Sequence, residues 1–303
     1  MKFRASGVGA GEAALGYSRC MSVPPFVLSI AGYDPSSGAG ITADIKTAAA
    51  QGCFAVTCIT ALTVQSTQGV FGVQPVEAEL VSRTLAALAD DLEIAAVRVG
   101  MLGSVEVAAA VAGFIDARKL PNVVLDPVIR SSSGAALLDD AGLEFLRRAM
   151  MPLCDVITPN VDEAAILVGA EPLAAEISWE DALPQLRGWA SKLHDLGTKG
   201  VVITGGHLRP ANDYLSYGRS GTSEDVAGYR KLRKFQEEII RGERLESGST
   251  HGTGCAFATA LACQLALGQE LPQAVRAAKD YVRRAMLAAY PLGKGIGPPN
   301  HMV

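Results

Sequence analysis

The sequence has few of the features that mark membrane and nucleic-acid-binding proteins. No apolar run approaches the ~18 residues that span a bilayer, and the net charge of -4 comes without a cluster of Lys or Arg. Six cysteines are scattered without a CxxC pair, so neither a zinc site nor a disulfide framework is indicated. We therefore expect a cytoplasmic protein with reduced, buried thiols, which contacts neither membrane nor nucleic acid.

Aromatic residues are also few, at 6%, whereas hydrophobic residues make up 49% of the 303 residues. Ala, Val, Leu and Gly dominate, which is typical of α/β proteins whose parallel strands are buried on both faces. Residues 1–22 are rich in Gly and Ala and lack the apolar core of a signal peptide, so we predict a flexible N-terminal extension. Residues 23–303 show no linker or shift in composition, which predicts a single domain.

From Pro25 onward, short apolar strands alternate with helical segments. Strands are predicted at 26–32, 54–65, 95–102, 122–128, 154–160 and 200–208, and helices at 39–52, 77–91, 105–119, 141–151, 161–169, 179–197, from 254 onward and at 271–290. This alternation predicts right-handed crossovers and one largely parallel sheet with helices on both faces. Segment 209–246 is polar and irregular, and there we expect one or two exposed antiparallel strands or a mobile flap.

The stretch HGTGC, at the start of the helix from 254, is a candidate phosphate cradle. Its two glycines permit a tight turn and close approach of a ligand to the backbone. The amides of Gly252, Thr253, Gly254 and Cys255 would then face outward at a helix N-terminus, which favours an anion. A glycine-rich turn before a core helix is the simpler alternative. The polar residues ESGSTH that lead into the turn make the phosphate-cradle interpretation more competitive with it.

Cys255 also allows a covalent interpretation. A helix N-terminus lowers the pKa of a thiol, and His251 lies close by in the chain, as a Cys/His hydrolase requires. No third residue that would orient the imidazole is evident, so the hydrolase interpretation is disfavoured.

Asn160 and Glu163 lie across a predicted junction between strand and helix, in TPNVDEA. Their spacing places both on one helix face, where both side chains can contact the water shell of a Mg²⁺ ion. The same pair fits a capping box, with Asn160 as N-cap, and the pair alone favours capping.

Three more polar residues follow apolar strands, at the edge of the sheet where ligands bind in such folds. Asp34 and Asp126 each precede a proline, so each is a candidate site residue and equally a candidate turn former. Gln65 presents both a donor and an acceptor, which suits the edge of an aminopyrimidine or pyridine ring, although a glutamine at a strand end is commonly just solvated.

Eight collinear motifs resemble the hydroxymethylpyrimidine/phosphomethylpyrimidine kinases of thiamine biosynthesis, in the ribokinase superfamily. In chain order they are SIAGYDPSSGAGITADIKTAAAQGC, ITALTVQSTQGV, VGMLGS, VVLDPV, ITPNVDEA, VVITGGHL, THGTGCAFATALA and GKGIGP. The resemblance spans about residues 27–301 and leaves out only the N-terminal extension. It implies a ribokinase-like three-layer α/β/α sandwich with a central, mostly parallel sheet.

The resemblance also implies phosphorylation of 4-amino-5-hydroxymethyl-2-methylpyrimidine and then of its monophosphate, with ATP and Mg²⁺, by a protein expected to be a homodimer. The implied pyrimidine contacts are Gly32, Asp44, Gln65, Met101 and Val128. Gly252, Gly254 and Cys255 would form the anion hole, with Cys255 as catalytic base where ribokinase relatives carry Asp. The implied residues on the nucleotide are Thr204, Gly206, Thr253 and Lys294. The implied holders of Mg²⁺, through water, are Asp126, Asn160 and Glu163.

The sequence departs from the family pattern at two positions. Many members have Lys where this chain has Thr204, and a hydroxyl cannot replace the charge of an ammonium, so Lys294 is a candidate substitute. Tyr33 stands where a small hydroxyl residue is common, and it could narrow the pocket or stack on a ring. Two alternatives therefore stay open: a pyridoxal or pyridoxine kinase, and a pyrimidine-binding protein with weak or no kinase activity.

Overall fold

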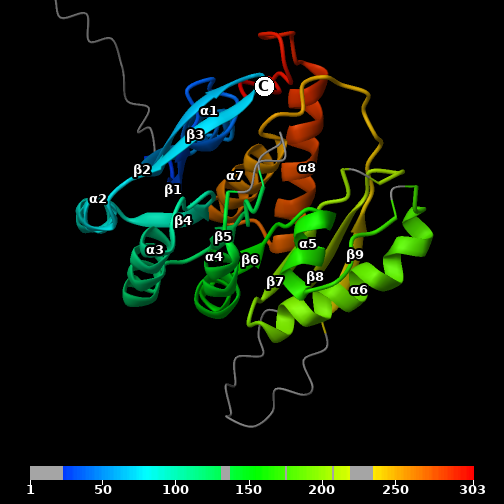
Figure 1. Ribbon diagram of the computed structural model, residues 1–303, viewed down its shortest axis with the longest axis horizontal. Helices are drawn as coiled ribbons and strands as arrows, with labels where there is room; N and C mark the ends of the chain where they lie inside the picture. The colour runs from blue at the N-terminus through cyan, green and yellow to red at the C-terminus, as the bar shows by residue number, and fades with distance from the viewer. Residues whose placement is uncertain (1–22, 131–136, 175, 207, 219–234) are drawn as a thin grey trace, which may run out of the picture.

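The computed structural model describes residues 23–130, 137–174, 176–206, 208–218 and 235–303. The expected extension at 1–22 and the middle of segment 209–246 lie outside these residues. The described strands form one nine-stranded sheet in the order β3-β2-β1-β4-β5-β6-β7-β8-β9, with helices on both faces (Figure 1). The predicted three-layer α/β/α sandwich is confirmed.

The centre of the sheet consists of parallel strands. They are β1 (Phe26–Tyr33), β2 (Phe54–Ser66), β4 (Ile94–Val99), β5 (Val123–Leu125), β6 (Val156–Ile157) and β7 (Gly200–Ile203). Apolar residues fill most positions of these strands because helices cover both faces. Because these strands are parallel, their carboxyl ends all lie at the same edge of the sheet, and the polar loops predicted from the sequence gather at this edge.

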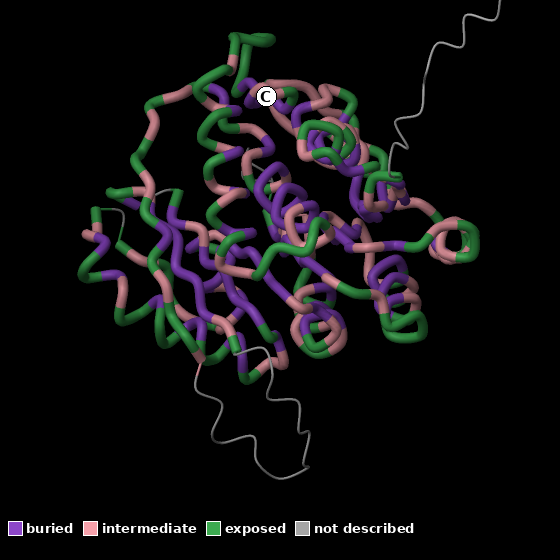
Figure 2. The backbone as a smooth tube through the Cα atoms, turned by 180° about the vertical axis from the view of Figure 1, so that it is seen from behind, coloured by how far each residue is buried: buried purple, intermediate pink, exposed green. Residues whose placement is uncertain are grey.

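The helices divide between the two faces. One face carries α1 (Gly40–Ala50), α7 (Thr253–Ala266) and α8 (Leu271–Leu287), and the other carries α2 (Ala78–Asp91), α3 (Val105–Arg118), α4 (Asp140–Phe145), α5 (Val161–Val168) and α6 (Trp179–Asp195). Figure 2 shows the buried tube segments concentrated in the sheet and on the inward sides of the helices. The predicted helix at 141–151 is divided: α4 continues as a π-helix at Leu146–Met150 and a 3₁₀ turn at Met151–Leu153. None of the helices in the described part of the chain is both long and apolar enough to cross a bilayer.

Strand β3 (Gly69–Pro75) was not predicted from the sequence. It turns back from β2 and pairs with it antiparallel at the edge of the sheet. Two glycines interrupt its apolar pattern, and Phe71 is 68% exposed, so neither burial nor alternation marks it as a strand. Pairing with β2 holds β3 in place, and that is a tertiary interaction.

In segment 209–246, the described residues form two antiparallel strands, β8 (Asp213–Tyr217) and β9 (Gln236–Ile240). The antiparallel pairing agrees with the prediction, but β8 is buried where an exposed strand was expected. It is covered because it pairs with β7 on one side and β9 on the other, next to α6: His194 Nε2 of α6 lies 2.9 Å from Ser216 Oγ.

A buried ion-pair cluster connects β4, α1 and the end of β5. The Arg98 side chain is fully buried, and its guanidinium lies 2.6 Å from Asp126 Oδ2 and 3.3 Å from Asp44 Oδ2. Buried charges of this kind require partners, because a lone one would lose its hydration without compensation. Gly100 makes room for the guanidinium: a Cβ there would lie 2.0 Å from Arg98 Nη1.

We predict that Gly100→Ala lowers the free energy of unfolding by about 1–3 kcal/mol, because the added methyl group displaces a buried, ion-paired guanidinium. Urea denaturation followed by circular dichroism measures the change. Gly113→Ala is the matched control: Gly113 lies in α3, where a Cβ would meet nothing within 4 Å, so this substitution is expected to raise stability by roughly 0.5–1 kcal/mol. Equal effects of the two substitutions would contradict the prediction.

Candidate active site

Loops from several strands meet the N-terminus of α7 at the carboxyl edge of the sheet. The loop after β1 contacts the approach to α7 through Asp34 and His251, and the end of β2 contacts it through Gln65. Cys255, in the first turn of α7, interacts with Asp126 at the end of β5. The sequence motifs that follow these strands therefore converge on one place, as predicted.

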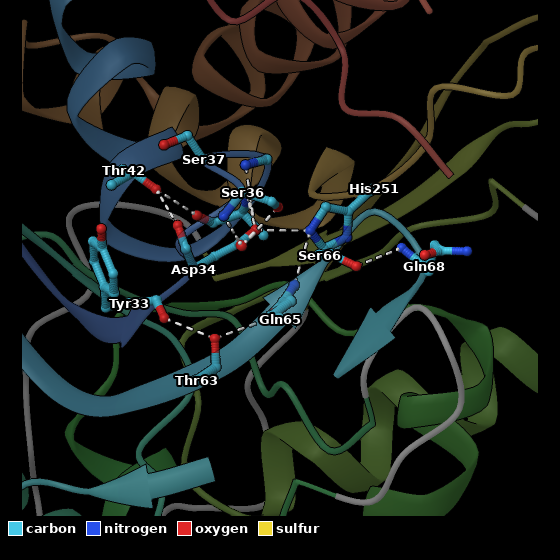
Figure 3. Close-up of polar contacts among 12 residues, drawn as sticks. Tyr33, Asp34, Ser36, Ser37, Thr42, Thr63, Gln65, Ser66, Gln68 and His251 are labelled. Atoms are coloured by element: carbon cyan, nitrogen blue, oxygen red, sulfur yellow. Dashed lines mark hydrogen bonds and ion pairs between the residues drawn. The ribbon is translucent and has the colours of Figure 1, made fainter. Parts of the chain in front are cut away.

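Asp34 organises the loop between β1 and α1. Its carboxylate accepts hydrogen bonds from the backbone N–H groups of Ser36, Gly38 and Ala39 and from the Ser36 hydroxyl, at 2.7–3.2 Å. His251 Nε2 lies 2.9 Å from Asp34 Oδ2 (Figure 3). Burial by itself would raise the pKa of the Asp34 carboxyl, but the hydrogen bonds from His251 and Ser36 hold it below its ordinary value. The turn-forming interpretation of Asp34 is confirmed, and the same carboxylate also reaches the site.

Gln65 lies at the end of β2, where the pairing of β2 with β3 shifts register between Val64 and Gln65. Irregularities of this kind re-aim side chains and are common beside active sites. Gln65 Nε2 lies 3.1 Å from His251 Nε2, and Gln65 Oε1 lies 3.1 Å from Thr63 Oγ1 (Figure 3). Gln65 is thus held by protein groups on two sides, which a merely solvated glutamine would not be.

His251 is a site residue that the sequence reasoning considered only for a hydrolase. It connects the loop of Asp34 with Gln65 of β2, and its own N–H donates to the Gly297 carbonyl at 3.1 Å. The sequence signal for a site residue here was the polar segment ESGSTH, which ends in His251. His301, near the C-terminus, had no such signal: its Nε2 lies 3.0 Å from the Gly38 carbonyl, in a fully tertiary contact.

The turn before α7 has the geometry of an anion site. Gly252 has a φ of +82°, and a Cβ there would lie 1.9 Å from the Gly38 carbonyl, so only glycine fits. As N-cap, Gly252 offers no side chain to cap the first amides of α7. Gly254 in the first turn is exposed. An exposed helix N-terminus of this kind favours a bound anion.

Cys255 is half-buried beside Arg98 and Asp126. Burial raises the pKa of its thiol to about 12, and the carboxylates of Asp126 and Asp44 add to the rise, whereas Arg98 opposes it. The lowering that a helix N-terminus would give is therefore outweighed, and the resting residue is a thiol. This result argues against the Cys/His hydrolase interpretation, which needs a thiolate.

Asp44 lies deeper than its implied role requires. Its side chain is fully buried, and its carboxylate accepts hydrogen bonds from Ser29 Oγ at 2.5 Å and Thr259 Oγ1 at 2.6 Å, beside Arg98. The structure therefore does not bring the Asp44 carboxylate to the open part of the site. Its implied contact with the pyrimidine stays a prediction, and the contacts seen in the structure are supporting ones: Asp44 pairs with Arg98, which in turn pairs with Asp126.

Two other implied pyrimidine contacts lie together. A Cβ on Gly32 would lie 3.1 Å from Met101 Cε, so the absence of a side chain on β1 leaves room for Met101. The Met101 carbonyl accepts a hydrogen bond from Thr60 Oγ1 at 2.5 Å, which fixes the loop after β4 against β2. Val128 follows β5 and is half-buried.

Asn160 and Glu163 form a capping box at the start of α5. Asn160 Oδ1 accepts from the Glu163 N–H at 2.9 Å, and Glu163 Oε2 accepts from the Asn160 N–H at 3.0 Å, so the capping interpretation is confirmed. Burial and the nearby Asp126 carboxylate raise the pKa of Glu163 to about 8. Burial also raises the pKa of Asp126, although Arg98 opposes the rise.

These residues suit a hydrated Mg²⁺ and not a directly coordinated one. Within the described residues, no group of three or more His, Cys, Asp or Glu side chains is arranged to hold a metal ion. The Glu163 oxygens already accept backbone N–H groups, but each carboxylate oxygen keeps a second lone pair for a water molecule. Water-mediated contact is the mode that Mg²⁺ commonly uses.

The residues implied for the nucleotide are placed on separate elements. Thr204 follows β7, and its N–H donates to the Pro159 carbonyl at 2.9 Å, next to Asn160; Gly206 is exposed. The Thr253 hydroxyl donates to the Thr250 carbonyl at 3.0 Å, within the turn before α7. Lys294 is exposed in the loop that packs on Thr67 at the β2–β3 turn, where the Gly295 N–H donates to the Thr67 hydroxyl at 3.2 Å.

The chain is similar to known proteins over most of its length. The sequence profile of a family described as phosphomethylpyrimidine kinase matches residues 34–300. A hydroxymethylpyrimidine/phosphomethylpyrimidine kinase from Streptomyces coelicolor is 40% identical over 92% of this chain and 94% of its own. An ADP complex of Bacillus subtilis pyridoxal kinase matches with a TM-score of 0.76 at 31% identity, over 92% of this chain and 97% of that one. A phosphomethylpyrimidine kinase from Clostridium difficile matches with a TM-score of 0.70 at 30% identity, over 86% and 99%.

We predict that iodoacetamide modifies Cys255 slowly at neutral pH and that the rate keeps rising past about pH 9, because the thiolate is the reactive form and the thiol has a pKa of about 12. Mass spectrometry of the peptide containing Cys255 gives the rate at each pH. Cys58, which is buried and has a pKa raised to about 11, serves as an internal reference for unfolding. A rate that levels off below about pH 8 would show a thiolate at neutral pH and contradict the prediction.

Proposed function

Because this chain belongs to the phosphomethylpyrimidine kinase family, we propose that it phosphorylates 4-amino-5-hydroxymethyl-2-methylpyrimidine and then its monophosphate, with ATP as donor. The product is the pyrimidine diphosphate used in thiamine biosynthesis. The observation that carries this proposal is that His251, the partner of Gln65, directly precedes Gly252 and the exposed N-terminus of α7. The segment His251–Gly252 therefore connects Gln65, the proposed contact to a heteroaromatic ring, with the N-terminus of α7, the proposed site for a phosphoryl group.

In the proposed reaction, the hydroxymethyl oxygen of the substrate attacks the γ-phosphorus of ATP, the bond to the β-phosphate oxygen breaks, and ADP leaves. In the second step a phosphate oxygen of the monophosphate is the nucleophile. The amides of the first turn of α7, around Gly254, stabilise the charge on the transferring group. Since phosphoryl transfer passes through a loose transition state, positioning and charge stabilisation contribute most of the acceleration.

Cys255 is the proposed acceptor of the substrate proton. Its raised pKa makes the thiolate scarce at neutral pH but strongly basic once formed, and a loose transition state demands little activation of the nucleophile. Asp126, which interacts with the Cys255 side chain, can take up the thiol proton. Arg98 stays charged beside both and limits the electrostatic cost of that transfer.

The proposed cofactor set is ATP with Mg²⁺. Asp126, Asn160 and Glu163 would hold the ion through its water shell, and a bound Mg²⁺ would neutralise charge on the phosphates. Thr204, Gly206, Thr253 and Lys294 are the proposed residues on the nucleotide side.

We also propose that the protein is a cytoplasmic homodimer. The thiols of Cys53, Cys58, Cys154, Cys255 and Cys263 are all free, which suits a reducing compartment. The β2–β3 hairpin exposes the apolar side chains of Leu62, Val64, Phe71 and Val73, and each residue has 40–68% of its surface accessible to solvent. Exposed apolar side chains gathered on one element are typical of a surface that a partner covers.

Pyridoxal kinase is the second candidate function, favoured by the structural similarity to the Bacillus subtilis enzyme. We predict that a product assay with Mg-ATP gives both the monophosphate and the diphosphate of the aminopyrimidine, because the α7 site accepts a phosphoryl group next to Gln65. The kcat/KM for the pyrimidine is expected to exceed that for pyridoxal by at least about 10-fold, the discrimination that one or two hydrogen bonds supply. Greater efficiency on pyridoxal would overturn the first choice.

Thr204 decides between an efficient kinase and a pyrimidine-binding protein. We predict that Thr204→Lys raises kcat by about 10-fold, because an ammonium at the end of β7 adds a positive charge for the nucleotide phosphates. Thr204→Met is the uncharged control of similar length and should give no gain. Binding of the pyrimidine without product in the wild type and in Thr204→Lys would favour the non-catalytic protein.

A further inference from the structure

The hydrogen-bond partners of Asp34 determine which hydrogen His251 must carry. Asp34 accepts from the N–H groups of Ser36, Gly38 and Ala39 and from the Ser36 hydroxyl, so it is an ionised carboxylate. His251 Nε2 lies 2.9 Å from Asp34 Oδ2, and a bare nitrogen lone pair at that distance would be repelled. Nε2 of His251 therefore carries a hydrogen and donates it to Asp34.

This assignment constrains the Gln65 amide. The atom of Gln65 that faces His251 lies 3.1 Å from the same Nε2. The single hydrogen on Nε2 is directed at Asp34, and a protonated Nε2 has no free lone pair, so an amide N–H of Gln65 would find no acceptor there. The amide oxygen and nitrogen can exchange places by rotation of the terminal bond without loss of either contact. Only the exchanged orientation, with the oxygen toward His251, places an acceptor beside the Nε2 hydrogen, which Gln65 then shares with Asp34 in a three-centre bond.

Thr63 gives an independent argument for the same orientation. Its hydroxyl lies 2.9 Å from the Tyr33 carbonyl and 3.1 Å from the Gln65 amide (Figure 3). A hydroxyl has one hydrogen, and a carbonyl can only accept it, so the hydrogen goes to Tyr33. The Thr63 oxygen then accepts from Gln65, which requires the amide nitrogen on that side.

The imidazole is itself held in place. The His251 side chain is only 12% exposed, and its backbone N–H donates to the Gly297 carbonyl. A Cβ on Gly38 would lie 2.5 Å from His251 Cδ2, so the ring packs directly on the backbone of the Asp34 loop. The ring therefore cannot turn away to release Gln65 at low cost.

We propose that Asp34 and His251 are specificity-determining positioning residues, which fix the Gln65 amide in one orientation and thereby select a 4-aminopyrimidine over its 4-oxo analogue. An amide has two acceptor and two donor positions. One acceptor position of the amide faces the shared N–H of His251, and one donor position is used by Thr63, so Gln65 keeps one acceptor and one donor for a ligand. That pair matches an amino group next to a ring nitrogen.

A 4-oxo pyrimidine presents the reverse pattern, a carbonyl acceptor next to a ring N–H donor. A freely rotating glutamine would turn over and bind it equally well. The Asp34–His251 pair prevents this turn, so the selectivity depends on residues that need not touch the ligand. This inference rests on the proposed function, because it takes Gln65 to be the group that meets the pyrimidine.

The test measures dissociation constants by calorimetry, and kcat/KM with Mg-ATP, for 4-amino-5-hydroxymethyl-2-methylpyrimidine and its 4-oxo analogue. The wild type is expected to favour the amino compound by about 100-fold, the discrimination that unpaired polar groups impose. In His251→Leu the preference should fall below about 10-fold, because the amide can turn over. His251→Gln, which can place an N–H near the former Nε2, should restore most of it.

The double variant separates positioning from a general loss of structure. In a Gln65→Leu background, His251→Leu should leave the ratio of the two compounds unchanged, and thermal unfolding checks that each variant folds. An unchanged ratio in His251→Leu alone, or an equal change with and without Gln65, would overturn the inference. Selective binding without turnover would refute the proposed function and leave the inference standing, whereas turnover without selectivity would do the reverse.

Discussion

The Asp34 carboxylate is the group on which the candidate site most depends. It binds the backbone of its own loop at Ser36, Gly38 and Ala39, and it receives His251 from a segment 217 residues away in the sequence. The loop that it shapes also presents the Gly38 carbonyl to Gly252 and to His301. The β1 loop, the N-terminus of α7 and the C-terminal segment therefore share one fixed point, and ionisation of Asp34 is what keeps them together.

A second buried charge supports the site from beneath. Arg98 pairs with both Asp44 of α1 and Asp126, which directly follows β5, beside Cys255, so the thiol lies among charges and not in an apolar pocket. Because burial and the two carboxylates together outweigh the single guanidinium around the thiol, the pKa of Cys255 is raised. The site thus combines an exposed helix N-terminus, which favours an anion, with a thiol that is neutral at rest.

Strong local signals made most of the fold predictable. Buried apolar strands, helix-ending glycines and strand-end loops located the parallel strands, α1, α3 and α5, and the convergence of the loops on Gly252 and Gln65. Strand β3 escaped prediction because its burial is slight and its pairing is with β2. The depth of Asp44 was not predicted, because sequence spacing tells which face of α1 a residue shares but not how deeply that face is buried.

The sequence by itself determined the alternation of strands and helices, the order of the motifs and the glycine-rich turn before α7, since these depend on neighbours in the chain. The tertiary structure alone decided which protein groups meet across the site: His251 with Asp34 and Gln65, Arg98 with Asp126, and Gln65 with Thr63. Hydrogen-bond partners and desolvation arise from the packing of distant segments, so no local pattern can specify them.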